Sequence, residues 1–233
     1  MMKTPELRKY RLFLAVLGLT AGTCCAQAFG ETPFDGLSAM VGSQRANPYI
    51  TAGDRSYVIG TQNGDFPDLG GHVPGEMGGI WAHPIKLLDG FWLKVTAKGE
   101  EAYWLNRATR YTTYPDRSEF EYETRAGRLS IKQMQFCPEG MPGVVVHYTI
   151  TNHTQRAMTI EADFIVKTDL SPVWFSKENG IHDYTDLIHW EQDDRLCIAR
   201  DSVNSWYCAW GSPASAVLFG ADAPTPVPTA GRG

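Results

Sequence analysis

The sequence lacks the common signatures of a self-contained catalytic or nucleotide-binding protein. It contains no GxSxG or SxxK nucleophile pattern, no P-loop and no GxGxxG fingerprint. It also has no Lys/Arg-rich block, and its net charge of −5 and pI of about 5.7 argue against a nucleic-acid partner. These absences leave acid/base hydrolysis, metal binding, carbohydrate binding and a structural role as the classes to weigh.

Cysteine is scarce, and none of the five has CxxC or Cys/His metal spacing. Three lie beyond the N-terminal region: Cys137, Cys197 and Cys208. Cys197 and Cys208 fall in two successive predicted strands, so a disulfide between them is one alternative in an oxidising compartment. The other alternative, which we favour, is that all three are small apolar core residues.

The N-terminus is typical of an export signal. Basic residues precede the apolar run Leu12–Gly22, and Ala26–Ala28 offers small residues to signal peptidase. The run is too short to span a bilayer in the mature chain. We therefore predict a signal peptide over 1–28 and an exported protein, periplasmic or extracellular. Lipoprotein anchoring through Cys24 is the lesser alternative, because Thr23 stands where a lipobox has Gly or Ala.

Beyond the predicted leader, apolar residues follow a period of two and show no sustained helical spacing. In the stretch 157–170 an apolar set alternates with a polar set that includes Asp163, which predicts a strand with one buried face. Phe120–Phe136 predicts a hairpin that turns at Ala126 and Gly127. Strand follows strand with short turns, so the expected fold is an all-β antiparallel sandwich.

The order of segments predicts three regions after the leader. An N-terminal extension covers 29–53, and the β-sandwich domain covers 54–220. Residues 221–233 hold three prolines among small residues and cannot pair in a sheet. We expect this last stretch to be a disordered tail or a truncated linker, so that the chain stops early.

Acids, histidines and glycines concentrate in Gly60–Trp92. Paired carboxylates there would suit hydrolysis of a glycosidic bond, but no motif sets their separation. Helical zinc spacing fails because Pro74 and Gly75 interrupt the segment between His72 and Glu76. Calcium bound by acids such as Asp65 stays open as the remaining metal hypothesis, and no other cofactor is indicated.

The glycines of this segment predict a tightly shaped loop, and such loops are usually functional or interfacial. A second aromatic and acidic insertion covers Ser171–Trp190. Aromatic planes match the apolar C–H faces of sugars, although core packing is the alternative role for each ring. We take no residue as catalytic; the candidates for carbohydrate binding or domain docking are Asp65, Asp68, His72, Glu76, Trp81, His83, Trp92 and Trp174.

The stretch "YVIGTQNGDFPDLGGHVPGEMGGIWAHPIKLLDGFW", followed by "TDLSPVW" and "DSVNSWYCAWG", resembles the N-terminal β domain of secreted bacterial glycogen-debranching-like proteins of the six-hairpin glycosidase superfamily. The resemblance covers roughly 54–220. It implies a galactose-mutarotase-like β-supersandwich that precedes an (α/α)6 barrel, and an amylo-α-1,6-glucosidase or glucoamylase-like activity for the parent enzyme. The barrel of that family supplies the acid and base, and no helical run able to build it follows Gly220.

The hypothesis is therefore a non-catalytic module of an exported glycoside hydrolase that acts on α-glucan. Whether the sandwich is complete stays open. Its expected partners are α-glucan or an oligosaccharide and the missing (α/α)6 domain, with no membrane span in the mature chain. A stand-alone carbohydrate-binding sandwich is the first alternative. A complete small glycosidase that uses Asp65, Asp68 or Glu76 is the second.

Overall fold

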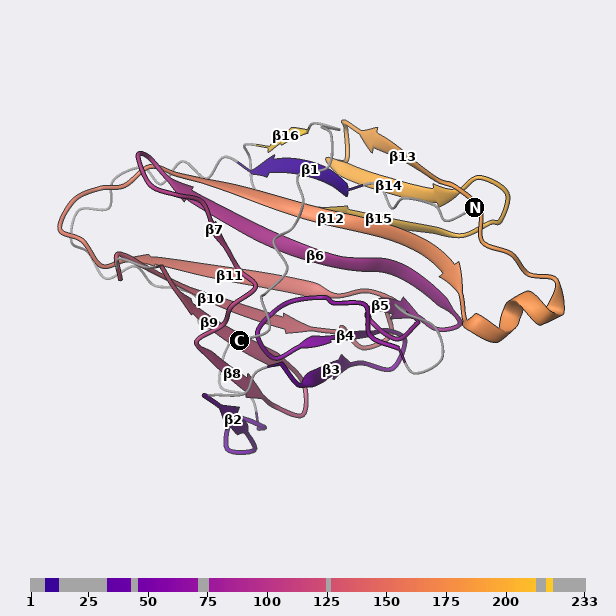
Figure 1. The fold of residues 1–233 in the computed structure, drawn as a ribbon, viewed down its shortest axis with the longest axis horizontal. Helices are drawn as coiled ribbons and strands as arrows, with labels where there is room; N and C mark the ends of the chain where they lie inside the picture. Colours follow the sequence, from indigo (N-terminus) through magenta and orange to yellow (C-terminus); the bar gives the residue numbers. More distant parts are fainter. Residues whose placement is uncertain are drawn as a thin grey trace.

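The computed structural model describes residues 7–12, 33–42, 46–70, 76–124, 127–212 and 217–219. These residues form three antiparallel sheets, which confirms the predicted all-β antiparallel sandwich (Figure 1). The helices among them are all too short to cross a membrane.

Two sheets face each other and the third lies at one side (Figure 1). Sheet A has the order β16 (Val217–Phe219), β1 (Leu7–Leu12), β12 (Ile160–Pro172), β6 (Ile85–Ala97), β5 (Gly79–Ala82), β4 (Tyr57–Thr61), β3 (Pro48–Ala52), and β7 (Tyr103–Trp104) also pairs with β6. Sheet B has the order β11 (Val145–Asn152), β10 (Leu129–Phe136), β9 (Ser118–Glu123), β8 (Arg110–Thr113), β2 (Ala39–Val41). Sheet C consists of β13 (Asp186–Glu191), β14 (Leu196–Asp201) and β15 (Tyr207–Gly211).

Alternating side chains from sheets A and B form the core. Val58 and Leu93 of sheet A, and Phe120, Tyr122 and Ile131 of sheet B, are almost completely buried in one cluster. Burying side chains of this size stabilises the fold by roughly 1.5–3 kcal/mol each. The core therefore lies between the two sheets, as in other sandwiches.

Buried polar side chains of β3, in sheet A, form hydrogen bonds with side chains of sheet B. Thr51 Oγ1 donates to Ser118 Oγ at 2.7 Å, and Gln135 Nε2 donates to the Tyr49 hydroxyl at 2.8 Å. Tyr49 and Thr51 lie in the stretch 29–53, which we predicted to be an extension outside the domain. The sandwich therefore begins before residue 54, because β3 completes both a sheet and the core.

The two longest strands, β6 and β12, pair along most of their length. Ile160 and Ala162 of β12 are buried as the alternation predicts, but Ile165 and Asp163 on the other face are buried too. The prediction of a single buried face was therefore wrong. Asp163 is 1% exposed and lies 2.5 Å from Lys94 Nζ of β6, and this ion pair offsets the cost of burying its charge.

The three cysteines of the domain are free and buried, as we favoured. Cys197 lies opposite Trp210, whereas Cys208 lies opposite Ala199. The two thiols are therefore diagonal rather than directly paired across the hairpin. Burial raises the pKa of Cys208 to about 12, so its thiolate is scarcely populated at neutral pH.

Several predictions concern the ends of the chain and one turn. Strand β1 falls within the predicted signal peptide and pairs with β12; the structure is that of the unprocessed chain, so the cleavage stays a prediction. The predicted cleavage region, Ala126 and the stretch 221–233 lie outside the described residues.

Candidate functional site

The predicted shaped loop folds back on itself between β4 and β5. Thr61 N donates to Asp65 O at 2.9 Å, and Met77 N donates to Leu69 O at 2.9 Å. The first bond closes a turn at the start of the loop, and the second joins Met77 to Leu69. Residues 71–75, which include the candidate His72, lie outside the described residues. The loop packs beside the central part of β6.

Asp65 holds this loop against β6. Its Oδ1 accepts hydrogen bonds from Trp92 Nε1 at 2.9 Å and from Phe66 N at 3.0 Å. Phe66 then lies over Gly90, where a Cβ would come within 2.6 Å of the Phe66 side chain. The geometry gives Asp65 and Trp92 a structural role, and Trp92 is only 5% exposed.

Trp81 is also an internal residue. It is 4% exposed, its Nε1 donates to the carbonyl oxygens of Met77 and Gly78 at 3.2 Å each, and the Tyr57 ring stacks on it at 6.2 Å. Neither Trp81 nor Trp92 presents a ring face to a ligand. Of the three candidate tryptophans, only Trp174 is left to contact a sugar.

The other polar candidates do not converge on one point. Asp68 and His83 are exposed and Glu76 is half-buried. His83 lies in the turn between β5 and β6, where Val173 N donates to Pro84 O at 3.1 Å. This bond places the His83 turn beside the start of the second insertion, which holds Trp174.

Trp174 begins the short 3-10 helix η1 (Trp174–Asn179) at the end of β12 (Figure 1). Its ring is 50% exposed and meets the ring of Phe175, which is 46% exposed, edge to face at 5.8 Å. Ser176 is the buried residue of this helix, and Gly180 caps the C-terminus of the helix in a left-handed conformation. An exposed aromatic pair is thus held on an anchored turn.

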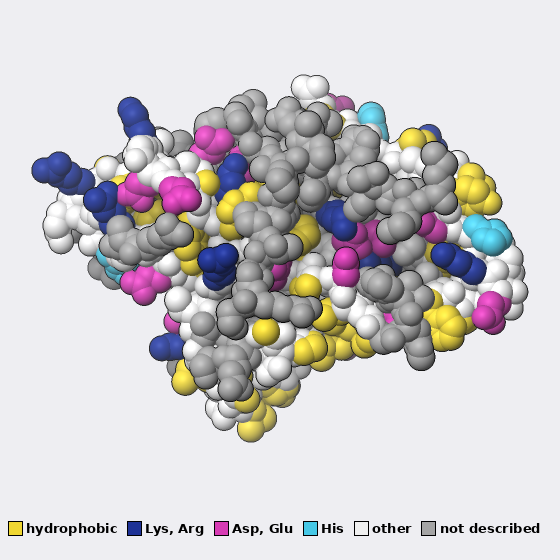
Figure 2. Space-filling model, viewed as in Figure 1, with side chains coloured by type: hydrophobic (Ala, Val, Ile, Leu, Met, Phe, Trp, Pro, Cys, Tyr) yellow, Lys and Arg dark blue, Asp and Glu magenta, His cyan; other side chains and the backbone are white. Residues whose placement is uncertain are grey.

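A cluster of four charged side chains lies where β6 begins and β12 ends, near η1. Lys86 Nζ contacts the carboxylates of Asp89 and Asp169, the latter at 3.2 Å, and Lys167 Nζ lies 2.5 Å from Asp89. Lys86 is 3% exposed, so its charge depends on these partners. Figure 2 shows charged side chains of both signs mixed over this face of the molecule.

The pKa values of the two carboxyl groups in this cluster are shifted in opposite directions. Burial and the nearby charge of Asp89 raise the pKa of Asp169 to about 6, against the pull of Lys86. Burial alone would raise the pKa of Asp89, but Lys86 and Lys167 outweigh it and hold that pKa below its ordinary value. Two neighbouring carboxyl groups whose pKa values are moved apart are the arrangement that acid/base chemistry uses. Here, however, Lys86 binds both carboxylates and forms an internal ion cluster with them.

The sequence did not reveal this cluster, because its members lie on two strands about 80 residues apart, joined by the register of β6 and β12. The signal present was a pair of charges in each strand, Lys86 with Asp89 and Lys167 with Asp169. Within the described ranges, no group of three or more His, Cys, Asp or Glu side chains is arranged to hold a metal ion.

An apolar hollow of about 570 Å³ lies between the sheets. Phe91 and Phe164 of sheet A, Val146 of sheet B and Tyr207 of sheet C are among the residues that line it. Tyr207 is 72% exposed at this place. Apolar surface of this kind is typical of a face that another protein segment covers.

No protein-family model matches the chain, and no curated protein or solved structure matches it.

Proposed function

We propose that this chain is a non-catalytic β-sandwich module that contacts α-glucan on behalf of an exported glycoside hydrolase. The observation that carries the proposal is the exposed pair of rings, Trp174 and Phe175, held by η1 at one end of sheet A. The resemblance to the β domain of glycogen-debranching-like proteins supplies the substrate class and the parent enzyme.

The pair suits a sugar because its two rings lie at 89° to each other. Such a corner offers one face to stack on a pyranose and one edge to flank it. Two polar residues could orient sugar hydroxyls. His83 is exposed in the turn whose Pro84 carbonyl accepts a hydrogen bond from Val173 N, and Asp169, which lies on β12 ahead of Trp174, has a carboxylate that is 36% exposed. A few polar groups around an aromatic surface are the usual composition of a small-molecule site.

The geometry of the carboxylates supports a non-catalytic role. Asp65 accepts hydrogen bonds from Trp92 and from the backbone, so replacing it should damage folding rather than chemistry. Asp89 and Asp169 share the buried Lys86, and such a cluster holds two strands together. The acid and base would then belong to a separate domain, whose docking would cover the apolar hollow.

Affinity electrophoresis in gels that contain glycogen tests the proposal. The unmodified chain should be retarded, and Trp174→Ala should run as in a gel without polysaccharide. Tyr207→Ala is the matched control, because Tyr207 is a more exposed aromatic residue at a different place. Equal retardation of all three proteins would contradict the proposal.

A stand-alone carbohydrate-binding sandwich is the second candidate, and the same rings favour it. The genomic DNA downstream, read in all frames, separates the two. A helical-barrel coding sequence supports the module of a hydrolase, whereas its absence supports the stand-alone binder.

A further inference from the structure

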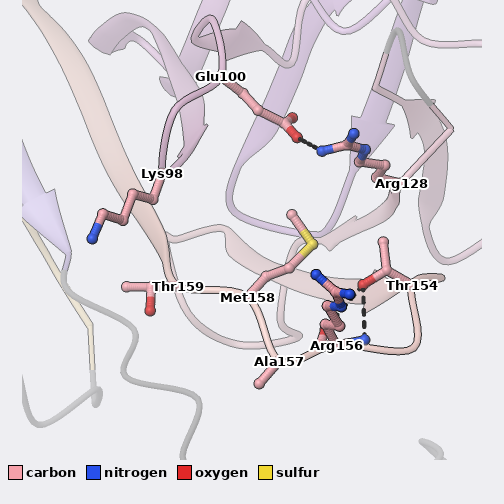
Figure 3. A pocket seen from close by; sticks show the side chains of 8 residues that line it. All are labelled: Lys98, Glu100, Arg128, Thr154, Arg156, Ala157, Met158 and Thr159. Carbon is pink, nitrogen blue, oxygen red and sulfur yellow. Dashed lines mark hydrogen bonds and ion pairs between the residues drawn. The ribbon is translucent and has the colours of Figure 1, made fainter.

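Figure 3 shows a pocket of about 510 Å³. The turns that line it lie at the end of the sandwich opposite η1 (Figure 1). Three connections turn there (Figure 1). The turns from β6 to β7 and from β9 to β10 close hairpins, and the turn from β11 to β12 crosses from sheet B to sheet A. The residues that line the pocket are Lys98, Glu100, Arg128, Thr154, Arg156, Ala157, Met158 and Thr159. Figure 2 shows Lys and Arg side chains at this end of the molecule, with Asp and Glu side chains among them.

The lining carries three cations and one carboxylate, although the whole chain has a net charge of −5. Arg128 Nη1 lies 2.6 Å from Glu100 Oε1, which neutralises one pair. In the part of the chain that the structure describes, Lys98 and Arg156 form no ion pair with a carboxylate. Among the described residues, therefore, no carboxylate compensates these two positive charges.

The backbone that presents these side chains is fixed by hydrogen bonds between the turns. His153 N donates to Arg128 O at 2.8 Å, which joins the β11–β12 connection to the β9–β10 turn, and Lys98 N donates to Thr159 O at 3.3 Å. Asn152 closes the turn by accepting from Thr154 N at 2.9 Å and donating to Arg156 O at 2.8 Å. The turns that carry the cations are thus held together by backbone hydrogen bonds.

We propose that this turn pocket, lined by Lys98, Arg128, Arg156 and Thr154, binds a phosphate group, either free or carried as the monoester of a sugar. Arginine presents a planar fork of donors that matches phosphate oxygens, and lysine adds a point charge. Figure 3 shows Lys98 on one side of the pocket and the Arg156 guanidinium on the other, near Thr154. A neutral glucan would leave both charges unused, so this site goes beyond the proposed function and uses none of its residues.

The hydroxyls and the remaining donors complete the recognition. Thr159 contributes a hydroxyl group to the lining, and the ion pair with Glu100 uses only part of the Arg128 guanidinium. The Thr154 hydroxyl donates within the turn, where Asn152 Oδ1 and Arg156 O are its acceptors. The carboxylate of Glu100 repels an anion while it holds Arg128 in place. Removing that charge should therefore strengthen binding rather than weaken it.

An NMR titration at constant ionic strength tests the site, with the amide signals of Thr154 and Arg156 as reporters. The probes are inorganic phosphate, glucose 6-phosphate and glucose. Phosphate-bearing probes should shift these signals, and glucose should not. If glucose 6-phosphate binds at least as tightly as inorganic phosphate, the ligand is a phosphorylated sugar; if inorganic phosphate alone binds, the ligand is free phosphate. Either result supports the proposal.

Variants give the sharper comparison. Lys98→Gln and Arg156→Gln should each weaken phosphate binding about tenfold, because each removes one charge-assisted contact. Glu100→Gln should strengthen it. Arg55→Gln is the control, since Arg55 lies in an exposed turn outside the pocket. Equal affinity in all these proteins, an equal loss in Arg55→Gln, or the same shifts with glucose would overturn the proposal.

Discussion

The indole N–H of Trp92 donates to the carboxylate of Asp65 across 2.9 Å, and this bond ties the glycine-rich loop to the central strand β6. Asp65, which the sequence offered as a candidate binding residue, therefore has a structural role in the fold. The same carboxylate also accepts a hydrogen bond from Phe66 N, so two donors depend on it.

Asp65→Ala should lower the free energy of unfolding by about 1–3 kcal/mol, because it leaves the partly buried Trp92 N–H without an acceptor. Urea unfolding followed by tryptophan fluorescence measures the loss. Asp68→Ala should change stability by less than about 0.5 kcal/mol, since Asp68 is exposed. Glucan binding should survive both substitutions, and its loss in Asp65→Ala with stability intact would argue for a direct role in the site.

Gly79→Ala should be among the most damaging substitutions in sheet A. Gly79 has φ of 97°, and a Cβ there would lie 2.1 Å from the carbonyl oxygen of Leu88. We expect a loss of about 2–4 kcal/mol from strain and steric clash. Thermal unfolding checks it against Gly99→Ala, because Gly99 has φ of 83° but no neighbouring atom within 4 Å. A loss no greater than in Gly99→Ala would show that β5 and β6 are not packed this closely.

The ion cluster predicts opposite pH dependences for its two acids. Because the pKa of Asp169 is raised to about 6, its favourable contribution is complete at low pH and is lost as pH rises through that value. The unmodified protein should therefore lose about 1 kcal/mol of stability relative to Asp169→Asn between about pH 4 and pH 6.5, after allowance for solvent screening.

Asp89 has the opposite sign, since its pKa is lowered by Lys86 and Lys167. Its contribution is present above the ordinary carboxyl pKa and is lost as pH falls through the lowered value. Asp89→Asn should be destabilised at neutral pH and approach the unmodified protein in acid. Chemical unfolding at a series of pH values measures both variants, and slopes of the same sign would contradict the arrangement of charges.

Strand pattern and fold class were predictable from the sequence because period-two alternation depends on local geometry. Burial on the second face of β12 was not, since the partner of the buried Asp163 is Lys94 of β6, a strand that is far away in sequence. The tryptophans show the same limit. Trp81, Trp92 and Trp174 are alike in sequence, but the fold buries the first two and exposes the third. The exposure of a side chain depends on contacts between residues far apart in the sequence, and the local sequence pattern carries no information about them.

The central claim is that Trp174 forms a glucan platform, and a calorimetric titration with maltoheptaose tests it most directly. The unmodified chain should bind, and Trp174→Ala should lose at least about tenfold in affinity while its thermal unfolding stays unchanged. Tyr207→Ala should bind like the unmodified chain. Undiminished affinity in Trp174→Ala, or no binding of maltoheptaose by the unmodified chain, would contradict the account.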